Sequence, residues 1–148
     1  MFIIYKMYKR IKNLSNKINN MYKVSPQIFI RFEDTDTQVN GSCITSYKKS
    51  DIILEINLPS NFGYKKKEAL FIDMVLIHEY CHYIEALSVP AKTRKELIFK
   101  YIESSKERMR DEKKTWRQTK KMAKCLGLWN KLFYNNTQQC LYACDLTY

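Results

Sequence analysis

The sequence predicts an α+β domain in which an N-terminal helix, a small three-stranded sheet and several later helices share one core. Three observations predict it. Apolar residues recur at spacings of three and four near the N-terminus, they alternate with other residues in two later stretches, and helical spacing returns from Lys65 onward. A chain of 148 residues, 45% of them apolar, has the length of one ordinary domain. We therefore expect a single domain over residues 1–148, with a core at 1–126 and the tail 127–148 packed on it.

The first element is an amphipathic helix that ends near Ser25-Pro26. Its apolar residues recur at helical spacing: Ile4, Met7, Tyr8, Ile11, Leu14, Ile18, Met21 and Tyr22. This spacing places them on one side of the helix, where they can pack against a core.

Three strands are expected next. Apolar residues alternate in QIFIRFE (27–33) and in DIILEINL (51–58), which is the period of half-buried strands. SCITSY (42–47), which follows Asn40-Gly41, is expected to be the middle strand. The three strands should form a small, mostly antiparallel sheet.

The rest of the chain is expected to be helical. Residues 65–87 form one helix, which Ser88-Val89-Pro90 ends. The polar region 93–126 is one long helix or two helices joined at Ser104-Ser105, and Gly127 stops it. The aromatic tail after it is expected to contain a short helix.

The net charge of +11 is unevenly distributed. Residues 1–31 carry seven basic and no acidic side chains, residues 32–91 carry five basic and nine acidic, and residues 92–124 carry thirteen basic and five acidic. The two basic regions flank a mildly acidic centre. They favour an anionic partner such as nucleic acid. The alternative is that these charges only solvate the outer faces of two amphipathic helices.

Targeting signals and a disulfide framework are not expected. Lys6 interrupts the opening apolar run, and the run from Ala69 to Ile77 contains Asp73 and is far shorter than the roughly 20 residues that cross a bilayer. The five cysteines form no C-x-x-C pair and are expected to be reduced thiols rather than ligands. We expect a cytoplasmic protein with no membrane partner.

The segment VLIHEYCHYIEAL (75–87) contains the two histidines of the chain, His78 and His82, and Glu79 follows the first. In a helix, residues i and i+4 lie one turn apart on the same face, so both imidazoles can bind one ion. Neutral imidazole is a preferred zinc ligand. Glu79, rotated by about 100°, lies beside such an ion and can take a proton from metal-bound water. A purely structural histidine pair is the alternative.

A catalytic zinc site has three protein ligands, and the chain has no third histidine. Carboxylates are the best candidates, and those after the motif are Glu85, Glu96, Glu103, Glu107, Asp111 and Glu112. Glu85 lies about 10 Å of helical rise from His78 and better suits a supporting position. Glu112 falls inside the apolar stripe of region 93–126, where a buried carboxylate needs a compensating cation. We predict Glu112 as the third ligand, with Glu103 as the next candidate.

HEYCH followed on a later helix by Glu112 resembles the gluzincins, zincin metallopeptidases whose third ligand is a glutamate. The order of elements and the segment DEKKTW (111–116) resemble minimal ImmA/IrrE-like domains. HEYCH also resembles the HExCH core of SprT-like proteases, whose third ligand is a histidine that this chain lacks. The gluzincin resemblance implies a zincin-like fold, a Zn2+ cofactor, and peptide hydrolysis through a zinc-bound water with Glu79 as general base. It also implies that an extended substrate pairs with an edge strand, either 42–47 or 51–58.

The leading hypothesis is thus a zinc-dependent metalloendopeptidase acting on a peptide or protein substrate. The alternative is a basic protein associated with nucleic acid, in which the zinc site is structural or catalytically idle. A protease directed to DNA-bound proteins would combine the two.

Overall fold

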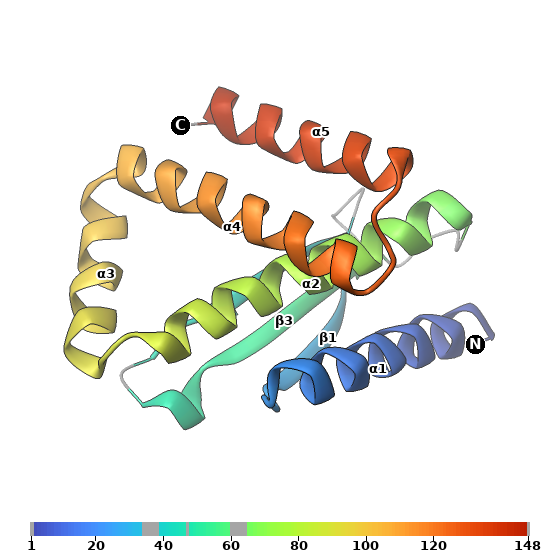
Figure 1. The fold of residues 1–148 in the computed structure, drawn as a ribbon, viewed down its shortest axis with the longest axis horizontal. Helices are drawn as coiled ribbons and strands as arrows, with labels where there is room; N and C mark the ends of the chain where they lie inside the picture. Colours follow the sequence, from blue (N-terminus) through green and yellow to red (C-terminus); the bar gives the residue numbers. More distant parts are fainter. Residues whose placement is uncertain (1, 34–38, 47, 60–64, 148) are drawn as a thin grey trace.

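The computed structural model describes residues 2–33, 39–46, 48–59 and 65–147, with the backbone alone at 33, 100–103, 105 and 143–147. The elements follow the predicted order (Figure 1). They are α1 (Phe2–Tyr22), β1 (Gln27–Glu33), β2 (Asn40–Ile44), the 3-10 turn η1 (Lys49–Asp51), β3 (Ile53–Pro59), α2 (Lys66–Ser88), α3 (Ala91–Glu103), α4 (Ser105–Cys125) and α5 (Lys131–Thr147). The predicted α+β class is confirmed.

The three strands form one mixed sheet in the order β1-β3-β2. β2 runs antiparallel to β3, whereas β1 runs parallel to β3, from Gln27 opposite Ile53 to Glu33 opposite Pro59. The expectation of a mostly antiparallel sheet is therefore wrong for the β1–β3 pair. Alternating apolar residues occur in both kinds of pairing, so their period does not show that β3 inserts between β1 and β2. This insertion leaves β2, the middle strand in sequence, at an edge of the sheet.

Helix α2 lies at the centre of the structure (Figure 1). It packs on β2 and β3 and also contacts α1, α4 and α5. Because α2 is covered on several sides, its residues from Ile72 to Cys81 are all buried. The sheet side of this core consists of Leu54, Ile56 and Leu58, each with 0% exposure.

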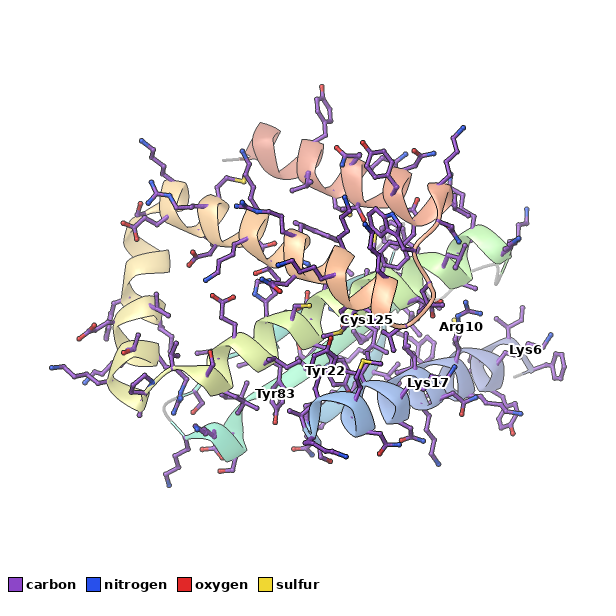
Figure 2. The ribbon with its side chains drawn as sticks, viewed as in Figure 1. Lys6, Arg10, Lys17, Tyr22, Tyr83 and Cys125 are labelled. Carbon is purple, nitrogen blue, oxygen red and sulfur yellow. The ribbon has the colours of Figure 1, made fainter. Side chains whose placement is uncertain are left out.

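Helix α1 joins α2 through apolar contacts and one ion pair. Four of its predicted core residues are buried: Met7, Ile11, Leu14 and Ile18. The other four predicted core residues, Ile4, Tyr8, Met21 and Tyr22, are exposed. Arg10 donates two hydrogen bonds to the Asp73 carboxylate, one from Nε (2.7 Å) and one from a terminal nitrogen (2.6 Å). Figure 2 labels Arg10 on α1. Burial raises the pKa of Asp73, and the Arg10 guanidinium opposes this rise.

The later helical region divides at the predicted joint. The Ser104 hydroxyl caps α4 by accepting a hydrogen bond from the backbone N–H of Glu107 (3.4 Å). Gly127, with a φ of 72°, lies just beyond the other end of α4. The tail forms α5, which has 17 residues and is longer than expected, and its Phe133 is fully buried. No helix among the described residues is both long and apolar enough to cross a membrane.

Candidate metal centre

The HEYCH segment lies on α2 where α4 packs against it. His78 is buried, and the His82 side chain is 25% exposed. Their Nε2 atoms lie 3.1 Å apart. The spacing of four residues therefore brings both imidazoles to one point, as predicted.

Helix α4 brings Glu112 to the same point. Glu112 Oε2 lies 3.1 Å from His78 Nε2, and Glu112 Oε1 lies 2.8 Å from His82 Nε2. One ligand atom from each of the three residues lies within 4.8 Å of the others. We call His78, His82 and Glu112 the His-His-Glu cluster. It joins the three residues that the sequence predicts as metal ligands.

The other predicted candidates lie outside this cluster. Glu85 forms an ion pair with Lys114, with 3.3 Å between Oε1 and Nζ, and Asp111 lines the neighbouring cleft. The side chain of Glu103, the second choice for third ligand, falls outside the described part of the structure. No cysteine among the described side chains joins the cluster, and Cys81 is a buried free thiol.

Two threonines of α4, which sequence reasoning missed, orient the histidines. The Thr119 hydroxyl donates to the Thr115 carbonyl (2.8 Å), and the Thr115 hydroxyl donates to the Asp111 carbonyl (2.9 Å). Each hydroxyl oxygen is then free to accept a hydrogen bond from an imidazole. Thr119 Oγ1 lies 3.1 Å from His78 Nδ1, and Thr115 Oγ1 lies 3.4 Å from His82 Nδ1. These contacts suit the tautomer that carries its hydrogen on Nδ1, in which Nε2 faces the cluster with a free lone pair. The available signal was the spacing of four between the threonines, which matches that of the histidines.

Trp116 holds the His78 ring from one side. The two rings stack with centroids 3.9 Å apart and an interplanar angle of 23°. Trp116 itself is buried. The imidazole is therefore fixed by an indole face and by a hydroxyl, which leaves it little freedom to turn.

The donor atoms of the cluster fit a metal ion. With hydrogens on Nδ1, two Nε2 lone pairs and a carboxylate face one another at 2.8 to 3.1 Å. This convergence is unfavourable unless a cation lies among them, either a proton or a metal ion. Ligand atoms held at about 2.0–2.1 Å around a tetrahedral ion lie about 3.3 Å apart, which is close to these separations. His78, His82 and Glu112 can therefore hold one metal ion.

The titration of the cluster reflects the same convergence. Burial lowers the pKa of His78. Burial also disfavours charge on His82, but its hydrogen bond with Glu112 and the nearby carboxylates outweigh this effect and raise the pKa of His82. For Glu112, burial acts to raise the pKa, but the two histidines together hold it well below its usual range. The cluster therefore favours an ionised carboxylate beside positive charge.

Glu79 lies beside the cluster without belonging to it. It is 5% exposed and lines the same cleft as His82 and Glu112. Burial raises the pKa of Glu79 to about 7, and Glu112 adds to the rise while His82 opposes it. A carboxyl group with this pKa can both accept and release a proton near neutral pH.

A cleft of about 440 Å³ opens beside the cluster, between β2, α2 and the two helices after it. Gly41 lets β2 approach α2 closely. A Cβ at Gly41 would lie 2.8 Å from Val75 Cγ1 and 2.9 Å from Glu79 Cγ. A side chain at Gly41 would have to displace Val75 or Glu79, so Gly41, like the two threonines, is a site residue that sequence reasoning missed.

β2 supplies the edge of the sheet that borders the cleft. Residues 41–43 line the cleft, and in the described part of the sheet β2 pairs with β3 alone. β3 has a neighbour on each side, so the expectation that 51–58 pairs with a substrate is wrong. The alternative, 42–47, overlaps β2 at 42–44, which forms the sheet edge beside the cleft, whereas 45 and 46 lie beyond the strand and Tyr47 falls outside the described residues.

Comparisons of the chain with protein-family models, with curated proteins and with solved structures found no match. The likeness of HEYCH and DEKKTW to zincins therefore rests on those residues alone. The function of the site has to be inferred from its chemistry.

Proposed function

We propose that this protein is a zinc-dependent peptidase that hydrolyses peptide bonds in the cleft between β2 and α2. One observation carries the proposal. The His-His-Glu cluster converges on one point, while Glu79 stands beside it, buried and outside the ligand set, in a cleft bordered by an edge strand.

The donor atoms favour zinc. Two imidazole nitrogens and one carboxylate oxygen match the ligands of catalytic zinc sites, which keep a further position for water or substrate. Calcium and magnesium prefer oxygen ligands throughout. His82 and Glu112 line the cleft, so that further position would face the substrate.

When bound, zinc would supply a Lewis acid that polarises the scissile carbonyl and makes the attacking water more acidic. The Glu79 carboxylate takes the proton of this water and gives it to the leaving amine. Thr115 and Thr119 keep the imidazoles in the tautomer that the ligand role requires. Trp116 shields the His78 ring from solvent on one side.

The edge strand suggests how a substrate binds. The outer backbone groups of β2 can pair with an extended peptide as an added strand. Leu97 and Ile98 of α3, with Ala86 and Val89 at the end of α2, line the opposite part of the cleft. Their apolar side chains can receive side chains of the peptide.

The test is metal analysis together with peptide cleavage. We expect about one zinc per chain in wild type and in Glu79→Gln, and little in His82→Ala or Glu112→Ala. Cleavage of an unstructured protein, followed by mass spectrometry, should fall by about 10²–10⁴-fold in Glu79→Gln despite retained zinc, because the general base is gone. A metal-free wild type, or full cleavage by Glu79→Gln, would contradict the proposal.

A further inference from the structure

The outer face of α4 carries a continuous row of basic side chains. Six of them follow spacings of four and three along the helix: Lys106, Arg110, Lys113, Arg117, Lys120 and Lys124. Lys114 and Lys121 flank this row, and all eight are exposed. We call these eight residues the α4 basic stripe.

The stripe contains charges of one sign. The acidic residues of α4 are Glu107, Asp111 and Glu112, and none of them interrupts the row. Asp111 and Glu112 instead line the cleft on the other side of the helix. A helix face that serves only for solubility gains from alternating signs, which form pairs at spacings of three and four. No acidic residue alternates with the six basic residues of the row, so positive potential is concentrated on this surface, although the flanking Lys114 is paired with Glu85.

The dimensions of the stripe suit a polyphosphate backbone. Lys106 and Lys124 lie 18 residue steps apart, which is about 27 Å at 1.5 Å per step, so the eight residues of the stripe offer a positive charge about every 4 Å on average. A DNA duplex presents a phosphate about every 3.4 Å on each strand. We infer that the α4 basic stripe binds the phosphate backbone of double-stranded DNA without reading its sequence.

The chemistry of the stripe favours a duplex over other polyanions. Binding of single strands usually relies on aromatic side chains that stack on bases, and no aromatic residue belongs to the stripe. The nearby Trp129 is half-buried, with the Nζ atoms of Lys120 and Lys124 over its ring at 5.3 and 6.0 Å. A helix that binds a membrane surface inserts apolar groups, whereas the apolar face of α4 is already packed in the core.

The proposal is tested on the full chain with a fluorescent 25-base-pair DNA duplex. One variant combines Lys106→Gln, Arg110→Gln, Lys113→Gln and Arg117→Gln. The matched control removes the same number of charges from exposed positions of α1 with Lys6→Gln, Lys9→Gln, Lys12→Gln and Lys17→Gln. We expect the α4 variant to lose at least about tenfold in affinity at low salt, and the slope of log K against log salt to become shallower by about 3 to 4, one counterion-release step for each lost phosphate contact. The α1 control should change affinity by less than about threefold.

Several outcomes would overturn the inference. Equal losses in the two variants would show an effect of net charge alone, and tighter binding to a single strand of the same length would exclude a duplex site. Flotation with phosphatidylglycerol vesicles, without duplex binding, would assign the basic surface to membranes, for which α1 is the stronger candidate because Phe2 and Tyr5 are 71% and 63% exposed. Circular dichroism and thermal unfolding confirm that each variant folds. Glu79→Gln should bind the duplex as wild type does, so this test does not depend on the proposed peptidase activity.

Discussion

Helix α2 places ionisable side chains in two buried interfaces, and these side chains have different partners in the two interfaces. Toward α1, Asp73 meets Arg10 in a two-point ion pair that is complete within the chain. Toward α4, the His-His-Glu cluster brings two imidazole nitrogens and a carboxylate to one point, where either a proton or a metal ion can lie among them. A completed pair suits a structural role, whereas converging acceptors create a site for an ion. The same helix therefore has a structural face and a functional face.

The largest expected difference between the two interfaces is their response to metal. Zinc at a thousand times its Kd should stabilise wild type by about 4 kcal/mol. For a chain of this size this corresponds to a rise in Tm of about 10 °C, measurable by scanning calorimetry with and without chelator. Asp73→Asn should keep this rise, and Glu112→Ala should lose most of it. An equal metal response in both variants would erase the distinction.

The second prediction concerns pH in metal-free protein. Burial raises the pKa of Glu79 from 4.5 to about 7, so the folded state holds this proton more tightly than the unfolded state does. Wild type should therefore lose stability as pH rises from about 4.5 to 7, by about 3 kcal/mol at most. Glu79→Gln lacks this loss, so its advantage over wild type in urea unfolding should be absent below pH 4.5 and complete above pH 7.

The exposed Glu96→Gln serves as the control for that measurement. A constant difference between wild type and Glu79→Gln across pH 4.5 to 8 would show that Glu79 does not titrate as described.

The third prediction tests the completed pair. Arg10→Met leaves the Asp73 carboxylate buried without its partner and should cost about 2 kcal/mol, a value reduced because Arg10 is 32% exposed. Asp73→Asn should cost less, because the guanidinium left behind can reach solvent. The control Arg31→Met breaks the ion pair between Arg31 and Glu55. The Arg31 side chain is 60% exposed, so this change should cost less than about 1 kcal/mol. Urea unfolding ranks the three variants, and a reversed order would refute the account of the α1 interface.

The smallest expected effect comes from the hydroxyl that holds His78. Thr119→Val removes the acceptor for Nδ1 and should weaken zinc affinity about tenfold in a chelator competition. Thr137 of α5 offers a matched control. It is also buried, its hydroxyl also donates to the carbonyl four residues earlier, and it has no contact with a histidine among the described residues. Thr137→Val should leave zinc affinity unchanged. Equal losses in both variants would mean that helix packing, rather than the imidazole contact, carries the effect.

Much of the fold and most of the site could be predicted because they depend on local spacing. The turn of an α-helix aligns His78 with His82, and the apolar stripe of α4 turns Glu112 inward whatever lies opposite. The joint at Ser104 was visible because a serine hydroxyl caps helices. The pairing of the strands was less accessible, because the alternation in β1 and β3 is equally compatible with parallel and antiparallel neighbours.

Thr119 and Gly41 show a second limit. A threonine inside a helical stripe looks like any small core residue until the opposite helix places an imidazole against it. In the sequence, Gly41 is only the residue before a predicted strand. The structure shows that a Cβ at this position would lie 2.9 Å from Glu79 Cγ. Neither role depends on neighbours in sequence, so neither leaves a periodic signal.

By itself, the sequence determined the helical phases, the histidine pair with Glu79 beside it, and the row of like charges on α4, because each follows from the 3.6-residue turn. Only the tertiary structure decided that α4 packs on α2 so that Glu112 meets both imidazoles, that β2 is the edge strand at the cleft, and that Asp73 pairs with Arg10. These are contacts between segments far apart in the chain, and their geometry is set by how whole faces pack rather than by local spacing.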